Sequence, residues 1–155
     1  MRSALFIILL TVVYENFFEW WVHKYLLHGL GKNRASFWSF HWIDHHSKAR
    51  RNGFIDPDYA NQSWSWNSST KELAALLAGG IIHLPLLLIS PLAYGTLVAC
   101  GIWYYSAHRW SHTHPAWANK HLSWHWDHHM GPDQNRNWCV TWPLTDWILG
   151  TRKKD

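Results

Sequence analysis

Histidines are concentrated in two short stretches of this 155-residue chain. Twelve of the thirteen lie within residues 21–47 and 108–130, and the interval between the stretches holds only His83. Neutral imidazole is the commonest metal ligand among protein side chains. Both stretches directly follow apolar segments that are long enough to enter a bilayer. The pattern therefore indicates a metal cluster on one face of a membrane.

The spacing of the histidines selects ten of them as candidate ligands. His108 and His112 lie four residues apart, and His125 is followed by His128 and His129, so each set projects from one face of a helix. The complete set of candidates is His23, His28, His41, His45, His46, His108, His112, His125, His128 and His129. His114 and His121 fit the spacing less well. They are possible additional ligands, although hydrogen bonding or lining of a substrate site suits them better.

The number of candidate ligands favours two metal ions. A closed structural zinc site needs about four ligands. Ten histidines are therefore too many for one such site, and two such sites would leave two histidines unused. Divided between two iron ions, they supply about five each and leave a position open for oxygen, as non-haem iron requires. We therefore expect two iron ions with dioxygen as co-substrate. Zinc binds nitrogen sites more tightly than ferrous iron, so isolated protein could carry zinc instead.

Three carboxylates lie close to the histidines in the sequence. Glu19 precedes His23 by one helical turn, and Asp44 and Asp127 lie inside histidine groups. Carboxylates that accept a hydrogen bond from a ligating imidazole fix its tautomer and its orientation. The expected role of all three is to position ligands rather than to bind the metal directly.

The apolar segments predict an all-α membrane protein with about three membrane-embedded helices, at residues 3–28, 73–90 and 92–107. Along the first helix, Glu15, Glu19 and His23 share one stripe, which should face inward because ionisable groups are costly in lipid. The last two helices form a hairpin that turns near Ser90-Pro91. Ser69-x-x-Glu72 has the form of a capping box that opens this hairpin. Residues 37–47 are expected to form an interfacial helix.

The chain reads as one domain, residues 1–155, whose histidine-rich cap comprises residues 23–47 and 108–130. Thirteen of the fourteen Lys and Arg residues lie outside the apolar segments, on the side of the histidines, so the positive-inside rule makes the histidine face cytoplasmic. Acidic headgroups explain this basic face more simply than nucleic acid does. Two cysteines without a C-x-x-C pair support neither a zinc ribbon nor a disulfide framework.

The histidine groups resemble those of the sterol desaturase/fatty acid hydroxylase superfamily. The residues that carry the resemblance are Glu19-Trp-Trp-Val-His23-Lys-Tyr-Leu-Leu-His28-Gly29, His108-Arg-x-x-His112-x-x-Pro115-x-Trp117, His125-x-x-His128-His129 and the closing segment Asn137-Trp-Cys-Val-Thr-Trp-Pro143-Leu-Thr-Asp146-Trp-Ile-Leu-Gly150-Thr151. The chain departs from the family in its second group, which reads H-x-x-x-H-H instead of H-x-x-H-H. In an α-helix His46 would be turned by about 140° from His41, which makes His46 a poorer candidate ligand.

The resemblance implies an oxygen-dependent di-iron hydroxylase that attacks a C–H bond of a membrane lipid, such as a fatty acyl or sterol-like chain. The electron donor would be separate, a ferredoxin or a b-type cytochrome with its reductase, because the chain has no flavin, nicotinamide or iron–sulfur motif. Carotenoid ring hydroxylation and lipid desaturation stay open as alternatives. From another class, a non-enzymatic metal-binding or metal-transport membrane protein is also open. The membrane would be the bacterial plasma membrane or the endoplasmic reticulum.

Overall fold

The computed structural model describes residues 2–61 and 65–154, which form helices and connecting turns without a β-strand. The first long helix, α1 (Arg2–Trp21), continues into a π-helix, η1 (Val22–Gly29), and a short 3₁₀ turn, η2 (Leu30–Lys32). The remaining elements are the π-helix η3 (Phe40–His45) and the α-helices α2 (His46–Arg51), α3 (Pro57–Ala60), α4 (Ser68–Ile82), α5 (Pro85–Ile89), α6 (Pro91–Thr113), α7 (Pro115–His121), α8 (Ser123–Met130) and α9 (Leu144–Ile148).

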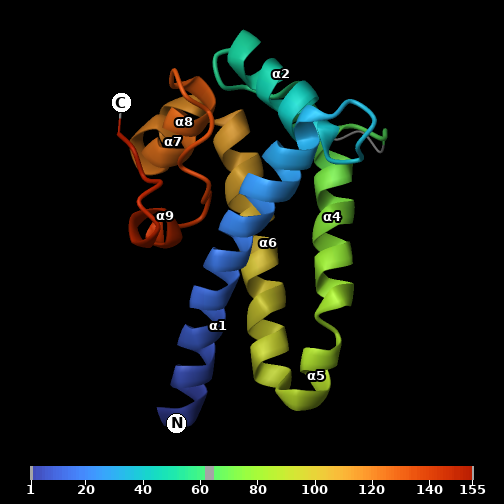
Figure 1. Ribbon diagram of the computed structural model, residues 1–155, viewed down its shortest axis with the longest axis vertical. Coiled ribbons are helices and arrows are strands. Elements are labelled where there is room, and N and C mark those ends of the chain that lie inside the picture. The colour runs from blue at the N-terminus through green and yellow to red at the C-terminus, as the bar shows by residue number, and fades with distance from the viewer. Residues whose placement is uncertain (1, 62–64, 155) are drawn as a thin grey trace.

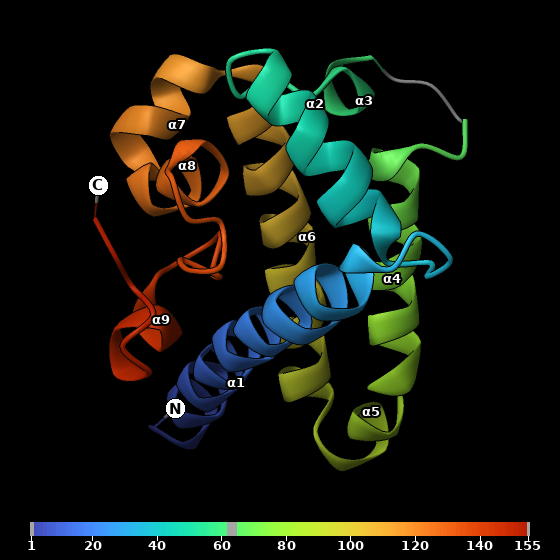
Figure 2. The same ribbon diagram turned by 45° about the horizontal axis from the view of Figure 1, so that its top comes forward.

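Three long helices, α1, α4 and α6, run between two ends of the molecule (Figure 1). The N-terminus of α1 and the short helix α5 lie at one end, and α2, α7 and α8 gather at the other. Figure 2, with the upper end turned forward, shows these cap helices around the end of α6. The candidate ligands leave the long helices at this end, so the cap is where they meet.

Two helical segments, Arg2–Lys32 and Ser68–Ile89, are long and apolar enough to cross a membrane. Side chains on the second segment face outward without protein cover: Leu77, Ile81, Ile82 and Leu88 are 63–90 % exposed. Such a continuous apolar surface suits lipid better than water. The third predicted membrane helix corresponds to α6, which is 23 residues long but is not one of these two segments. Its position in the bilayer stays a prediction.

The helical hairpin turns at Ser90-Pro91 as predicted, since α6 begins at Pro91, but its first arm differs from the prediction in two places. α4 stops at Ile82 and α5 starts at Pro85, because proline has no backbone N–H to donate to the preceding turn and its ring clashes with the carbonyl group there. The capping box predicted at Ser69 and Glu72 is wrong. Asn67 caps α4 instead, accepting from the backbone N–H of Thr70. The side chain of Glu72 therefore takes no part in capping α4.

The C-terminal segment is tied to α1 by a set of buried hydrogen bonds. Glu19 accepts the backbone N–H groups of Val140 and Thr141 on Oε1 and the Thr141 hydroxyl on Oε2, the last at 2.6 Å. Asn16 donates to the carbonyl oxygen of Trp142 at 2.6 Å. Asp146 accepts the N–H groups of Trp138 and Cys139 within the segment itself. These bonds fix residues 138–142 against the helix that leads to His23.

Candidate metal centre

All ten candidate ligands are brought together at the cap end of the three long helices. Each of them is at most 2 % exposed. They come from η1, η3, α2, α6 and α8, so segments far apart in the sequence converge on one site. Sequence spacing alone selected this set, and the fold buries every member of it.

The first group of ligands contains five imidazoles whose nitrogen atoms lie within 4.8 Å of one another: His23, His28, His41, His46 and His128. The Nε2 atoms of His23 and His41 are 2.9 Å apart, and those of His28 and His46 are 3.1 Å apart. Rings this close, with their nitrogens facing, enclose a point from several directions. We call this set group one.

The second group contains His45, His108, His112 and His129, under the same distance limit. His125 lies beside it, with its Nε2 atom 3.1 Å from that of His112 and its ring centroid 4.7 Å from that of His129. We call these five residues group two. The ten candidates thus divide evenly between two neighbouring positions.

The two π-helices explain how ligands five residues apart reach the same position. His23 and His28 lie in η1, while His41 lies in η3 and His46 immediately follows it. Hydrogen bonds from i to i+5 widen the turn, so residues five apart come onto one face. The ring centroids are 5.0 Å apart in the first pair and 4.8 Å in the second. The expectation that His46 points away from His41 assumed an α-helix and was wrong.

Residues that are adjacent in the sequence belong to different groups. His45 belongs to group two while His46 belongs to group one, and on α8 His129 and His128 divide in the same way. The rings of His46 and His129 stack with centroids 4.1 Å apart, which joins the two groups directly. Two ions held by these groups would lie side by side.

Four of the ligand imidazoles donate a hydrogen bond from Nδ1 to an acceptor oxygen outside the two groups. Nδ1 of His112 donates to the carbonyl oxygen of Phe54 at 2.8 Å, and Nδ1 of His128 donates to that of Arg136 at 2.6 Å. Nδ1 of His23 donates to the carbonyl oxygen of Trp138. Nδ1 of His45 donates to a carboxylate, that of Asp56, at 2.6 Å. A neutral ring that donates from Nδ1 presents a lone pair on Nε2, so these acceptors prepare the rings for a metal.

Two carboxylates beside the ligands were missed by the sequence analysis. Asp56 is fully buried against His45, and it also caps α3 by accepting from the N–H of Asp58. Oε1 of Glu72 lies 2.7 Å from Nδ1 of His108, although the angle between the groups is not that of a hydrogen bond. Asp56 lies eleven residues after His45 in the sequence, outside the histidine stretches, and Glu72 was predicted as part of a capping box. Only the tertiary fold brings either of them to an imidazole.

The three carboxylates that the sequence singled out are placed elsewhere. The hydrogen bonds of Glu19 go to the C-terminal segment and Asn16. In the described part of the chain, no hydrogen bond or ion pair joins Asp44 to a histidine. Asp127 lies 3.5 Å from the guanidinium of Arg152. Glu19 still bears on the site, because the segment that it holds carries the Trp138 carbonyl group behind His23.

The remaining histidines lie outside both groups. His114 is exposed and stacks on Trp110 with ring centroids 3.5 Å apart. His121 is also exposed and packs against Trp117. His83 caps the end of α4, donating from Nδ1 to the carbonyl oxygen of Gly79 and accepting the hydroxyl of Tyr14 on Nε2.

Burial keeps the ligand imidazoles neutral. It lowers the pKa of His41, His45, His46, His112, His125 and His129 well below the usual value, and neighbouring histidines add to the effect. The pKa of His128 falls to about 4, chiefly through burial. Neutral rings carry the lone pairs that a metal needs.

His46 differs from the other members of group one in its outer contact. The side-chain amide nitrogen of Gln134 lies 2.9 Å from Nδ1 of His46 and 2.9 Å from the carbonyl oxygen of His129. An amide N–H that donates to Nδ1 leaves the ring proton on Nε2. In this arrangement His46 donates toward its neighbours, whereas His23 and His128 present lone pairs.

The donor atoms fit transition-metal ions. Nε2 of His45, His108 and His129 is buried without a hydrogen-bond partner in residues 2–61 and 65–154. Leaving so many buried nitrogen atoms unsatisfied is costly, and a bound cation would satisfy them. All-imidazole sites suit zinc, copper, iron and nickel rather than magnesium or calcium. The residues present therefore fit two transition-metal ions.

Comparisons with known proteins identify no relative. No family model, no curated protein and no solved structure matches this chain. The chemistry of the site is therefore inferred from its own residues.

Proposed function

We propose that this chain is a membrane-bound di-iron oxygenase that hydroxylates a C–H bond of a lipid. The observation that carries the proposal is the contact between the metal centre and an apolar cavity. His23 of group one and Glu72 beside group two both line that cavity. An alkyl chain lying there would have its end against the ligands.

The cavity lies between α1, α4 and α6 and has a volume of about 690 Å³. This is within the range of sites that hold small organic ligands. Its wall is made mostly of aliphatic side chains and glycines, among them Leu76, Leu97 and Gly101. Because α4 exposes its outer face to lipid, a chain would enter from the bilayer rather than from water.

Iron suits the site better than zinc because of the number of imidazoles. Groups one and two contain five each, with no thiolate among them, which exceeds the four ligands of a structural zinc site. Iron bound there would supply the activation of dioxygen, with two electrons and two protons, so that RH and O₂ give ROH and water. The electrons would come from a separate donor such as a ferredoxin or a b-type cytochrome.

The chain's own residues would orient the ligand rings and exclude water from the site. The backbone carbonyl groups of Phe54, Arg136 and Trp138 and the carboxylate of Asp56 orient four of the rings. The apolar wall excludes water from the reacting chain. Glu72 is 4 % exposed at the junction of cavity and metal centre, where its Oε1 atom lies 2.7 Å from Nδ1 of His108.

The rival from another class is a non-enzymatic metal protein. A transporter binds its ion near the middle of the bilayer. Here the ligands lie at the cap ends of the helices: His108 and His112 are in the last turns of α6, and His23 and His28 follow α1. This placement favours a reaction at the membrane surface. Carotenoid ring hydroxylation and lipid desaturation use the same site, so the product decides between them.

The test is to identify the source of oxygen in the product. Iron-loaded protein in lipid nanodiscs would be supplied with a reductant and ¹⁸O₂, and the extracted lipids analysed by mass spectrometry. We expect a lipid that gains one ¹⁸O atom, no product from His128→Ala, and full product from the matched control His114→Ala. A product two hydrogens lighter without ¹⁸O would indicate desaturation. Equal product from His128→Ala would contradict the proposal.

A further inference from the structure

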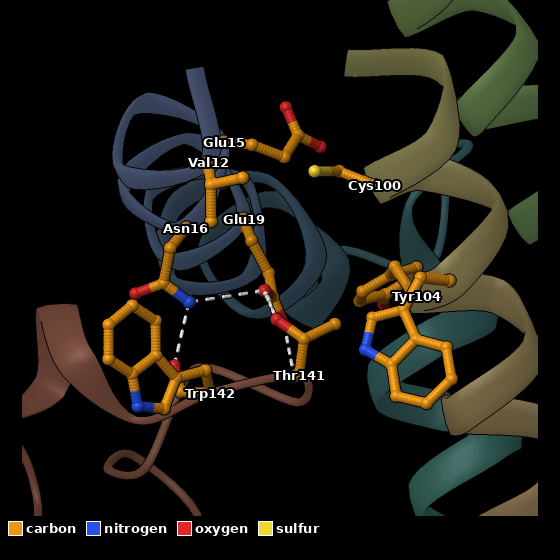
Figure 3. Close-up of a pocket in the computed structure, with 9 residues that line it drawn as sticks. Val12, Glu15, Asn16, Glu19, Cys100, Tyr104, Thr141 and Trp142 are labelled. Carbon is orange, nitrogen blue, oxygen red and sulfur yellow. Dashed lines mark hydrogen bonds between the residues drawn. The ribbon is translucent and has the colours of Figure 1, made fainter. Parts of the chain in front are cut away.

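Glu15 is an acidic residue on the cavity wall that the metal centre does not use. It lies on α1, and lines both the large cavity and a smaller one of about 130 Å³ between α1, α6 and the C-terminal segment. Figure 3 shows its carboxyl group beside Cys100, one helical turn from Glu19. Glu15 and Glu19 thus lie at the boundary between the two cavities.

One carboxyl oxygen of Glu15 is buried without a partner. Its Oε2 atom is inaccessible and makes no hydrogen bond within the described ranges of the chain. An ionisable side chain at membrane depth is costly, and such residues are normally paired. A buried carboxyl oxygen without a hydrogen bond adds a further penalty. A molecule that enters the cavity would remove this penalty by donating a hydrogen bond to that oxygen.

Other polar side chains along this part of the wall already have partners. His83 bonds to Gly79 and Tyr14, and Tyr94 donates to the carbonyl oxygen of Gly80 at 3.4 Å. Glu19 accepts hydrogen bonds from Val140 and Thr141. Away from the metal end, Glu15 therefore offers an acceptor atom on this wall that no residue in 2–61 or 65–154 satisfies.

The position of Glu15 sets a distance from the metal centre. Eight residues of helix separate it from His23, which corresponds to about 12 Å at 1.5 Å per residue. The wall opposite is widened by glycines. A Cβ atom built on Gly79, Gly80 or Gly101 would meet no atom within 4 Å. A chain that carries a substituent has room beside Glu15.

We propose that the carboxyl group of Glu15 accepts a hydrogen bond from a hydroxyl group on the lipid, about 12 Å along the chain from the carbon that faces the metal centre. The substrate class is a long-chain lipid that already bears a hydroxyl group. This inference rests on the proposed function, because it takes the large cavity to be the lipid site. The competing partner is water held in the small cavity.

The test compares octadecanoic acid with a set of its monohydroxylated derivatives that move the hydroxyl group stepwise along the chain. Binding to the full-length protein, as purified in detergent, would be measured by native mass spectrometry over a concentration series. We expect one hydroxyl position to bind about tenfold more tightly than the unsubstituted acid, since one added hydrogen bond to a buried acceptor is worth up to about that factor. Positions on either side should show a smaller gain.

Variants separate the hydrogen bond from the shape of the cavity. Glu15→Leu should remove the preference and leave the affinity for the unsubstituted acid unchanged, which also shows that the variant is folded. Glu15→Gln, which keeps an acceptor, should retain part of the preference. Gly101→Leu should weaken all probes by filling the cavity, and the lipid-facing control Leu88→Ala should weaken none.

Two results would overturn the inference, and they are distinguishable. Equal affinity of the wild-type chain for every probe, or a preference that survives Glu15→Leu, would make water the partner of Glu15 while leaving the lipid cavity intact. Binding of none of the probes to the wild-type chain would reject the cavity as a lipid site, and with it the substrate side of the proposed function.

Discussion

Nδ1 of His45 donates a hydrogen bond of 2.6 Å to Oδ2 of Asp56, and both side chains are fully buried. The bond joins a group-two imidazole to a carboxylate eleven residues along the chain. Burial raises the pKa of Asp56 to about 6, although the backbone N–H of Asp58 lowers it, so the carboxyl group is mostly charged at neutral pH. The pair orients His45 and increases the basicity of its ring.

Replacing Asp56 should therefore weaken one metal site. We expect Asp56→Ala to reduce the affinity of group two by about 10–100-fold, as loss of a hydrogen-bond partner of a ligand typically does. Metal retained per chain, measured after dialysis against a chelator, tests this. Asp44→Ala is the matched control, since Asp44 lies next to His45 in sequence without bonding to a histidine. Equal metal loss from both variants would contradict the assignment.

Glu19 should stabilise the folded chain by holding the C-terminal segment against α1. Glu19→Ala leaves two backbone N–H groups and the Thr141 hydroxyl without their acceptor, which we expect to lower the free energy of unfolding by about 2–5 kcal/mol. Thermal unfolding in detergent measures the loss. Glu19→Gln keeps an acceptor oxygen and should lose less than half as much. If Glu19→Ala instead unfolds at the wild-type temperature, the segment is held by other contacts.

His46 should contribute less to metal binding than His128 does. Gln134 donates to Nδ1 of His46, whereas Nδ1 of His128 donates to a backbone carbonyl group and leaves its Nε2 lone pair free. Metal titration of His46→Ala should therefore show a smaller loss of affinity than titration of His128→Ala. Gln134→Leu should release Nδ1 of His46 and strengthen binding slightly. A larger loss from His46→Ala than from His128→Ala would show that His46 is a full ligand.

Acid should destabilise the metal-free protein. The pKa of His128 is about 4 in the folded state against about 6.5 in an unfolded chain. The unfolded state therefore binds more protons as pH falls below about 6.5, and stability that is fully present at pH 7 is lost between about pH 6.5 and 4. His128 alone contributes roughly 3 kcal/mol to this loss. Unfolding temperatures measured across this range should fall, and a flat profile would mean that the rings are hydrated.

Much of the site could be predicted from the sequence because histidine spacing is a local signal. All ten candidate ligands lie together in the structure, and two of the three expected apolar helices are long and apolar enough to cross a membrane. The π-helices could not be predicted, because periodicity arguments assume 3.6 residues per turn. For that reason His46 was expected to point away from its group.

Contacts between segments that are distant in the sequence could not be predicted either. Asp56 and Glu72 approach His45 and His108 only after α3 and α4 pack beside α6. Nearby carboxylates such as Asp44 were the natural candidates by sequence distance, yet the helix geometry turns them elsewhere. The carbonyl groups behind His23 and His128 belong to the C-terminal segment, and no side-chain pattern marks a backbone acceptor.

We propose that the chain holds two irons, one in each group of imidazoles. The most direct measurement is elemental analysis of protein made under iron-replete conditions, with His128→Ala and the exposed control His114→Ala alongside. We predict about two irons per chain in the wild type and in His114→Ala, with a partial loss in His128→Ala. The proposal would be contradicted if each chain held a single tightly bound zinc, if iron never replaced this zinc, and if His128→Ala left the zinc content unchanged.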